Sequence, residues 1–221
     1  MKLISFSLYN EGSNIAKRPH GRGIKKHVRF ENYTVGAIEN AKIARELFSE
    51  FVCRFYVQDD MKEVIENLRS EGAGVILRKN NYTAQQPCMP MMWRNEPLID
   101  DDFEICLFRD TDSRLSLRER VLIDKFMESN KKFHVIRDHR CHREPIMGGM
   151  WGAKKTDKKI ATIIKNVFKE PIMDYGTDQN TFKNKIWPII KPYTLVHDSR
   201  RDNSDFIPNP DGSHIGQIIP V

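Results

Sequence analysis

The chain has 221 residues, of which 39% are hydrophobic and 30% charged, a balance typical of a soluble globular protein and not of a disordered one. Its net charge of +6 invites a nucleic-acid interpretation, but 30 acidic residues are mixed with the 36 basic ones, and aromatic and basic residues are not interleaved. We therefore expect a solvated, charged surface and a pocket for an anionic small molecule, with no nucleic-acid partner.

The sequence shows no membrane segment and no disulfide pattern. No apolar run approaches the roughly 20 residues that a membrane-spanning helix requires. Residues 1–12 carry one lysine and a short alternating run, so we expect a first strand there and not a signal peptide. The four cysteines are widely separated and include no C-x-x-C pair, which indicates reduced core thiols in a reducing compartment.

Strand and helix patterns alternate along the chain, which predicts βα units and a mainly parallel sheet. The first elements are a strand at 2–9, a polar loop at 10–31 and a helix at 35–51 whose apolar residues recur at helical spacing. The expected elements after them are a strand at 53–57, a helix from 61 to about 72, a strand at 74–78, a connection rich in proline and methionine at 83–97, a strand over 103–108, a helix at 117–127, a strand at 133–137, helices at 158–168 and 177–190, and a strand at 195–197.

These elements predict one domain followed by a tail. Residues 1–199 are expected to form a single α/β domain. Residues 200–221 are rich in Pro, Asn, Asp and Gly, so we expect an irregular tail that packs on the domain and wraps it or closes over a site. No internal repeat is visible, and the sequence does not indicate an oligomeric state.

Two carboxylates one residue apart follow the apolar run that ends at Phe108. Asp110 and Asp112 are therefore expected just past a strand, at the carboxyl edge of the sheet, where ligands bind in open α/β sheets. Neighbouring carboxylates repel each other unless a cation lies between them, so the spacing suits a hard divalent metal with oxygen ligands. A bare D-x-D also occurs in solvated turns, so the other motifs must decide.

Three further polar clusters fall at expected strand ends or loops. Gly148 and Gly149 permit close approach of the backbone to a ligand. Asp178 and Gln179 lie in the first turn of an expected helix, and His197 ends the last strand. In the stretch before the two glycines, His139 and His142 flank Cys141, but the second pair of closely spaced ligands typical of zinc is missing. We expect His139 to orient a loop or contact a ligand.

Together the motifs R-D-x-D-S-R at 109–114, R-D-H-x-x-H-x-x-P-I-x-G-G-M-W-G at 137–152, G-x-D-Q at 176–179 and H-D-S at 197–199 resemble those of small glycosyltransferase-like proteins with the GT-A fold. Relatives occur in bacteria and in large DNA viruses, including sugar transferases of algal viruses. The resemblance runs over about 33–217. It implies a GT-A-like (Rossmann-like), mixed but mostly parallel sheet flanked by helices. It also implies a cytoplasmic location, which for a viral protein is the host cytoplasm.

The resemblance implies a metal site. Asp112 matches the direct metal ligand of the family, and Asp110 the residue that touches ribose or metal. His197 matches a third ligand near the C-terminal end of the domain; the alternative is a surface or core histidine. An imidazole suits Mn²⁺ better than Mg²⁺, so Mn²⁺ is the first expectation and Mg²⁺ the second.

Catalytic residues also follow from the resemblance. Asp178 would be the general base of an inverting enzyme, whereas in a retaining enzyme Asp178 and Gln179 would orient the donor. The alternative is that Asp178 only favours the helix dipole.

The remaining matches are expected to contact the donor or acceptor. Gly148, Gly149 and Trp151 would line the sugar and acceptor side, with Trp151 either stacking on a sugar ring or filling the core. Tyr9 and Arg78 end expected strands and would contact the base and the diphosphate.

The resemblance implies metal-dependent transfer of a sugar from a nucleotide-sugar donor, which it suggests is UDP-linked, to a hydroxyl of a glycan or glycoprotein. One alternative is a metal-dependent nucleotidyl or phosphoryl transferase, although the sequence lacks a P-loop. The other is a nonenzymatic basic module for nucleic acid or anionic glycan, whose binding would depend steeply on salt and not on metal.

Overall fold

The computed structural model describes residues 1–9, 30–79, 89–100, 103–155, 157–169, 177–202, 204–209 and 211–221. In these ranges seven strands form one sheet in the order β3-β2-β1-β4-β6-β5-β7. β6 is antiparallel to β4 and β5, and the other neighbouring pairs are parallel. The strands are β1 (Lys2–Leu8), β2 (Phe51–Gln58), β3 (Gly74–Arg78), β4 (Ile105–Arg109), β5 (Phe133–Arg137), β6 (Met150–Lys154) and β7 (Thr194–Asp198).

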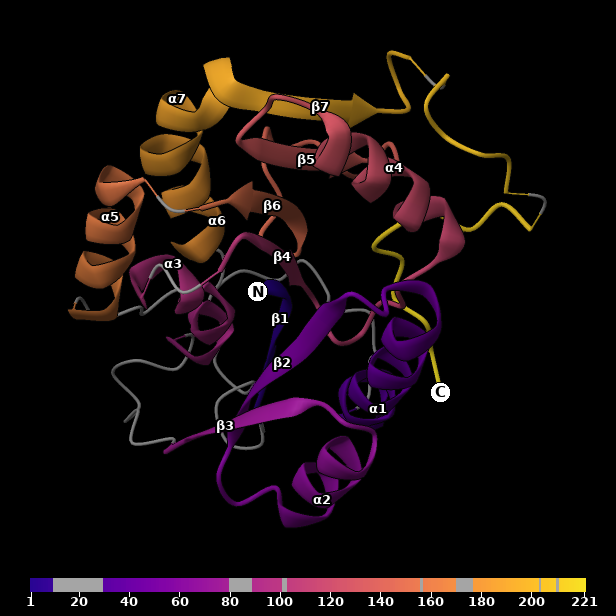
Figure 1. The fold of residues 1–221 in the computed structure, drawn as a ribbon, viewed down its shortest axis with the longest axis vertical. Helices are drawn as coiled ribbons and strands as arrows, with labels where there is room; N and C mark the ends of the chain where they lie inside the picture. The colour runs from indigo at the N-terminus through magenta and orange to yellow at the C-terminus, as the bar shows by residue number, and fades with distance from the viewer. Residues whose placement is uncertain are drawn as a thin grey trace, which may run out of the picture.

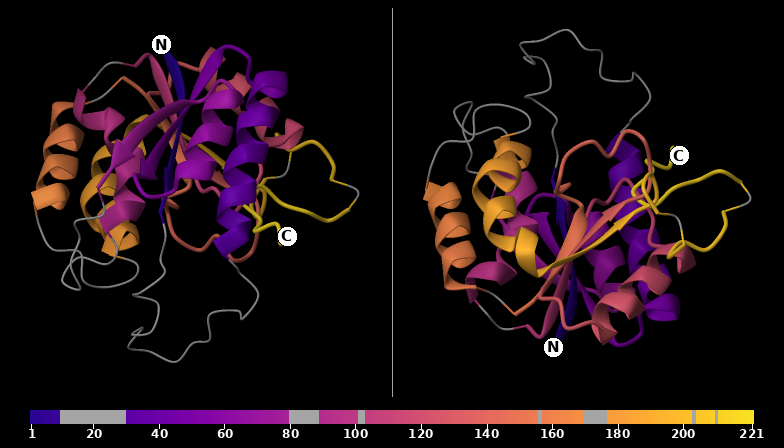
Figure 2. Two further views of the ribbon diagram at one scale, coloured as in Figure 1. Left: turned by 90° about the horizontal axis from the view of Figure 1, so that it is seen from below. Right: turned by 90° about the horizontal axis from the view of Figure 1, so that it is seen from above.

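Helices cover both faces of the sheet, as Figures 1 and 2 show. One face carries α1 (Phe30–Leu47), α2 (Lys62–Ser70) and α4 (Leu117–Glu128). The opposite face carries the 3-10 helix η2 (Met89–Asn95), α3 (Pro97–Asp100), α5 (Lys158–Lys169), α6 (Thr177–Thr181), the π-helical turn η3 (Phe182–Ile186) and α7 (Trp187–Ile190), with the short 3-10 turn η4 (Lys191–Tyr193) leading into β7. This is a mixed, mostly parallel α/β architecture in one layered unit, as expected.

The alternation of side chains along β1 explains how the two layers attach. Ile4 and Phe6 face the α1 side and are fully buried, and each such side chain contributes about 1.5–3 kcal/mol through burial. Ser5 and Ser7 face the opposite side. The Ser5 hydroxyl donates to the carbonyl oxygen of Arg94 at 2.7 Å, and the Arg94 amide donates to the Ser7 oxygen at 2.8 Å. Two buried hydroxyls thus fix η2 against the middle of the sheet.

Two expected helices differ in their extent. The first begins at Phe30 and ends at Leu47, and Phe51 already starts β2. The rings of Phe48 and Phe51 pack edge to face at 6.0 Å, so the apolar spacing that suggested helix to residue 51 serves the turn between the two elements. The helix expected at 177–190 is divided into α6, η3 and α7, and Pro188, which has no amide hydrogen, follows the π turn.

β6 was not expected from the sequence, because its M-W-G-A-K run follows two glycines and resembles a ligand loop. The expected polar loop at 10–31 lies outside the described residues as far as residue 29, and the expected connection at 83–97 as far as residue 88. None of the helices in the described ranges combines the length and apolar character that crossing a bilayer requires.

Candidate active site

A cavity of ≈ 460 Å³ opens at the carboxyl edge of the sheet. Its walls come from the end of β1, the turn after β4, the loop between β5 and β6, the start of α6 and the C-terminal tail. Parallel strands bring these segments together because their carboxyl ends meet at one edge. Seven of the expected site residues line this cleft: Tyr9, Asp110, Asp112, Gly148, Gly149, Asp178 and Gln179.

The acidic pair lies against the glycine loop. A Cβ atom on Gly149 would fall on the carboxylate of Asp110, and its next neighbour would be the Asp110 amide nitrogen at 3.1 Å. Only a glycine lets the backbone pass so close to this side chain. The second glycine of the pair therefore has a defined function: it makes room for the Asp110 carboxylate at the cleft.

Arg94 is a cleft residue that the sequence did not reveal. Its side chain is 7% exposed, and one terminal nitrogen donates to Oδ1 of Asp110. The other terminal nitrogen lies 4.0 Å from Oδ2 of Asp178, and Nε has no hydrogen-bond partner among the described residues. A buried guanidinium with unused donors between two carboxylates organises the site. The only signal in the sequence was one arginine directly after the apolar run M-P-M-M-W at 89–93.

Burial and charge perturb the carboxyl groups in the cleft. Burial, together with the neighbouring Asp110, raises the pKa of Asp112 to about 7. Burial also raises the pKa of Asp178, although the positive charge of Arg94 opposes the shift. A carboxyl group with a raised pKa, placed in a cleft, has the properties of a general base or of a ligand for a cation.

Gln179 holds the glycine loop in place. Its amide nitrogen donates to the carbonyl oxygen of Ile146, and its side-chain oxygen accepts from the amide of Gly148 at 3.2 Å. Both hydrogen-bonding groups of this side chain are therefore used inside the protein. These two hydrogen bonds join Gln179 to the loop beside Asp178.

The charged residues of the cleft fit a divalent cation. When they are all ionised, the three carboxylates among the described lining residues outweigh the one guanidinium by two negative charges. Oxygen ligands of this kind suit Mg²⁺ or Mn²⁺ with coordination positions left open for phosphate oxygens. A cation beside Asp112 would stabilise its ionised form and would so oppose the burial that raises its pKa. Within the described ranges no group of three or more His, Cys, Asp or Glu side chains has the geometry of a complete metal site.

His197 does not join the acidic pair. It lies in β7, 2% exposed, and Nδ1 is 2.8 Å from Oδ2 of Asp205. Its ring meets that of His134 edge to face at 4.9 Å, and it does not line the cleft. Of the two interpretations given above, the structure places His197 as a core histidine. The expected third metal ligand is therefore not at the cleft in this conformation.

Trp151 and Arg78 also lie outside the cleft lining. Trp151 is fully buried and stacks on Phe108, with ring centroids 4.4 Å apart, so it fills the core and presents no face to a sugar. β6 points this side chain inward, which the loop interpretation did not anticipate. Arg78 forms an ion pair with Glu96, with Nε 2.8 Å from Oε1, and lies over the ring of Tyr56.

His142 is a second lining residue that lacked an assigned role. Nδ1 accepts a hydrogen bond from the amide of Asp138 at 3.0 Å, so in the neutral ring the proton is on Nε2. Burial, assisted by His214 and His139, lowers the pKa of His142 to about 4. His142 is thus a neutral hydrogen-bond donor at neutral pH.

Comparison with known proteins bears on the fold. The sequence matches no protein-family model and no curated protein. The solved structure of 4-diphosphocytidyl-2C-methyl-D-erythritol synthase from Anaerococcus prevotii is 11% identical with a TM-score of 0.50, over 94% of this chain and 91% of that one. This likeness over nearly the whole of both chains supports the α/β fold class. The chain has a GT-A-like fold.

Two other solved structures have lower TM-scores. A glycosyltransferase involved in the glycosylation of the major capsid of PBCV-1 is 14% identical with a TM-score of 0.48, over 90% of this chain and 82% of that one. S. aureus TarS 1-349 in complex with UDP is 16% identical with a TM-score of 0.36, over 63% of this chain and 36% of that one.

Proposed function

We propose that this protein is a metal-dependent glycosyltransferase that moves a sugar from a UDP-linked donor to a hydroxyl of a glycan or glycoprotein. The observation that carries the proposal is the meeting of Asp110, Asp112 and Asp178 in one cleft at the carboxyl edge of the sheet. These carboxylates come from two segments far apart in the sequence. Their excess negative charge needs a cation, and a cation with open positions recognises a diphosphate.

Asp110 and Asp112 would hold Mn²⁺ or Mg²⁺. The metal would stabilise the negative charge that develops on the departing nucleoside diphosphate. The chain supplies the geometry. Arg94 fixes Asp110 by an ion pair, and Gly149 leaves the space that this carboxylate occupies. The Nε2–H of His142 would donate to an oxygen of the bound donor.

Asp178 would act on the acceptor. Its pKa is raised by burial, so the carboxylate is a better proton acceptor than an exposed aspartate. In an inverting reaction it would take the proton from the acceptor hydroxyl as that oxygen attacks the sugar. In a retaining reaction it would instead orient the donor sugar. The configuration of the product distinguishes these two roles.

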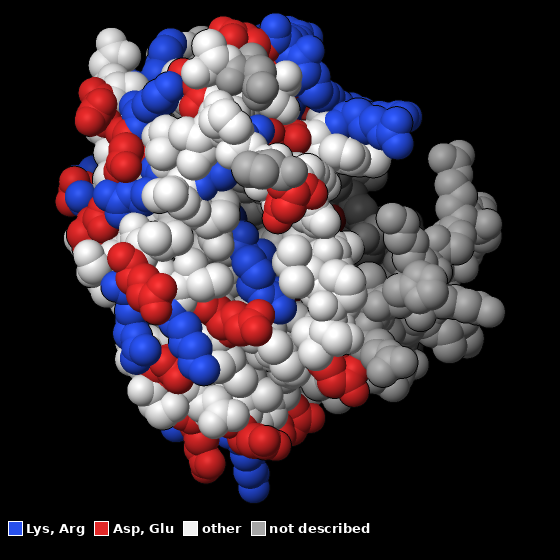
Figure 3. Space-filling view, turned by 90° about the vertical axis from the view of Figure 1, so that its right-hand side faces the viewer, with Lys and Arg blue, Asp and Glu red and all other residues white. Residues whose placement is uncertain are grey.

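The alternatives receive less support. A nucleotidyl transferase would use the same carboxylates, and the synthase named above shares the fold, so only the reaction products separate it from the transferase. A basic module for nucleic acid needs a continuous positive face. On the face shown in Figure 3, the described Lys and Arg residues are interspersed with Asp and Glu.

A donor panel tests the proposal. Purified protein is incubated with UDP-sugars, GDP-sugars or nucleoside triphosphates, with Mn²⁺ or with chelator, and the products are separated. We expect metal-dependent release of UDP, lost in Asp112→Asn and kept in Asp124→Asn, a carboxylate on the surface of α4. Release of pyrophosphate from a triphosphate would replace the proposal by nucleotidyl transfer. Binding of RNA that is weakened by salt and unchanged in Asp112→Asn would favour the basic module.

A further inference from the structure

The C-terminal tail forms one wall of the candidate cleft. Gly216 and Ile218 line the cavity beside the acidic pair. The amide of Ile219 donates to the carbonyl oxygen of Asp112 at 2.9 Å. The amide of Val221 donates to the side-chain oxygen of Asn32 at 3.2 Å, one residue before Tyr33, which also lines the cleft. The views in Figure 2 show the chain end next to α1.

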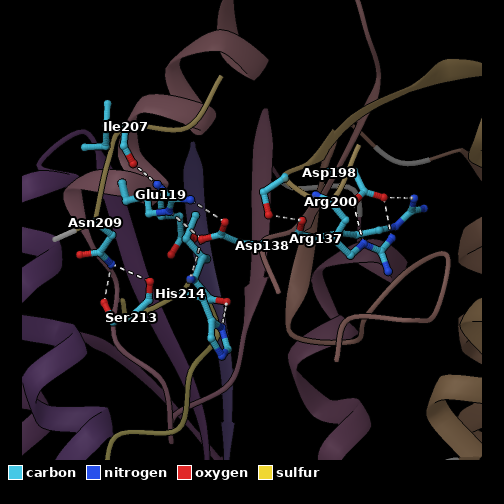
Figure 4. A network of polar contacts seen from close by, with 12 residues as sticks. Glu119, Arg137, Asp138, Asp198, Arg200, Ile207, Asn209, Ser213 and His214 are labelled. Atoms are coloured by element: carbon cyan, nitrogen blue, oxygen red, sulfur yellow. Dashed lines mark hydrogen bonds and ion pairs between the residues drawn. The ribbon is translucent and has the colours of Figure 1, made fainter. Parts of the chain in front are cut away.

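A buried ion pair holds the tail on the domain. The carboxylate of Asp138, at the end of β5, is 1% exposed and accepts two hydrogen bonds from Arg118 of α4, each 2.7 Å long. The same carboxylate accepts from the amide of Ile215 at 3.0 Å. The close-up in Figure 4 shows Asp138 beside His214, the residue before Ile215 in the tail. Arg118 also donates to the carbonyl oxygen of Ile207 and lies 4.8 Å from the ring of Phe206. Arg118 and Asp138 therefore hold the tail at two places. Arg118 contacts it at Phe206 and Ile207, and Asp138 contacts it at Ile215.

Histidines form a second contact between the tail and the domain. His214 of the tail stacks on His139, with ring centroids 4.1 Å apart and ring planes 10° apart. His142, which lines the cleft, meets His214 edge to face at 5.1 Å. The tail thus touches the ligand cleft from the side of the β5–β6 loop as well as through Ile219.

One glycine decides how closely the tail can pass. Gly216 has φ = +78°, a conformation that L residues rarely adopt. A Cβ atom on this residue would lie 2.6 Å from Sδ of Met150, which also lines the cleft. Gly212 has a similar φ of +71°, but a Cβ atom there would meet nothing within 4 Å. The two glycines share the backbone constraint and differ only in the contact with the cleft.

We infer that residues 214–219 are part of the ligand site, as a strap that contacts a bound nucleoside diphosphate through the Gly216 backbone and the Ile218 side chain. The inference rests on the proposed function of the cleft. Asp112 and Met150 line the cleft, and the strap also contacts both of them, through Ile219 and Gly216. Docking of the strap and binding of the ligand should therefore stabilise each other. Thermodynamic linkage makes this coupling reciprocal, so the ligand must also strengthen the docked strap.

The two glycines provide a matched test. UDP binding in the presence of Mn²⁺ is measured by calorimetry for the full chain, Gly216→Ala and Gly212→Ala. We expect Gly216→Ala to weaken UDP binding at least about tenfold and Gly212→Ala to change it less than about twofold. Equal affinity in the two variants would overturn the inference, since the backbone strain is common to both.

A second pair of variants tests the same inference in case Gly216→Ala fails to fold. Ile218 is 42% exposed, and Leu117, the first residue of α4, is 57% exposed and does not line the cleft, so alanine at either position leaves the core intact. Ile218→Ala is expected to weaken UDP binding several-fold and Leu117→Ala to leave it unchanged. No difference between these two variants would contradict a contact between the strap and the ligand.

Hydrogen exchange gives a readout independent of catalysis. In the unaltered protein, UDP with Mn²⁺ is expected to slow exchange of the Ile215 and Ile219 amides by at least about threefold. If UDP binds without slowing exchange at these amides, the inference that residues 214–219 contact the ligand is wrong, whereas the proposed function is unaffected. Failure of the unaltered protein to bind UDP at all would overturn the proposed function itself, and the strap's ligand with it.

Discussion

Arg94 and Asp110 form an ion pair at the floor of the cleft, and the same guanidinium lies 4.0 Å from the carboxylate of Asp178. The pair joins η2 to the turn after β4, and Asp178 adds the start of α6. The Arg94 backbone is hydrogen-bonded to two serines of β1, so the position from which its side chain extends into the cleft is fixed. The acidic groups that we propose to act on the metal and on the acceptor are therefore both next to one buried guanidinium.

Replacing Arg94 tests this organisation. Arg94→Met removes the positive charge between two carboxylates, so we expect donor turnover to fall by about a hundredfold or more, equivalent to about 2.7 kcal/mol or more in the barrier. The fold should survive, because Asp110 is half exposed and water can solvate it. Steady-state kinetics and urea unfolding measure the two effects. Arg78→Met, which breaks an ion pair outside the cleft lining, is the control, and an equal loss of turnover in both variants would contradict the assignment.

Gly149 predicts a steric effect on the metal site. Gly149→Ala places a methyl group on the Asp110 carboxylate, so the carboxylate must move and Mn²⁺ binding is expected to weaken at least about tenfold. Gly74→Ala is a fair comparison, because its Cβ would meet the Cys53 carbonyl oxygen at an ordinary 3.6 Å. Calorimetric titration with Mn²⁺ distinguishes them. Unaltered Mn²⁺ affinity in Gly149→Ala would show that Asp110 does not bind the ion.

The raised pKa of Asp112 predicts how metal binding depends on pH. With a pKa of about 7, the carboxyl group must lose a proton before it can bind a cation. The apparent affinity for Mn²⁺ should rise by up to about tenfold per pH unit between pH 5 and 7 and level off above pH 7. Titrations at constant ionic strength measure the slope. A flat profile over this range would show that no proton is displaced from Asp112.

His142 predicts a loss of stability in acid. Its folded-state pKa of about 4 lies below the roughly 6.5 of an unfolded chain, so the unfolded state binds more protons between these values. The stabilising effect is complete above about pH 6.5 and is lost as the pH falls towards 4, by at most about 1.4 kcal/mol per pH unit. In urea unfolding at pH 7 and 5, His142→Gln should lose less stability on acidification than the unaltered protein. An identical loss in both would contradict a neutral, buried His142.

The sequence predicted the elements that have clear periodicity. The strand at 74–78 and the strand at 133–137 have the expected bounds, and the helix from Leu117 ends one residue later than expected. β6 was missed because glycines before and within it hide the strand pattern. Gly152 is needed there since a Cβ atom would lie 2.8 Å from Leu107, a tertiary contact that periodicity does not encode.

The candidate site was predictable where residues follow strands directly. Asp110 and Asp112 follow β4, and topology alone brings them to the edge that Tyr9 also reaches. Arg94 was not predictable, because its position depends on Ser5 and Ser7 holding a 3-10 helix in an unusual segment. The resemblance predicted His197 to be a metal ligand, but its partner Asp205 lies in the tail, whose path sequence patterns do not determine.

The most direct measurement is a crystal structure of the protein with UDP and Mn²⁺, with anomalous scattering used to locate the ion. The account predicts a manganese peak in contact with the carboxylates of Asp110 and Asp112, bridging to the diphosphate of UDP inside the cleft. A diphosphate bound elsewhere, or a manganese ion held away from these two side chains, would contradict it.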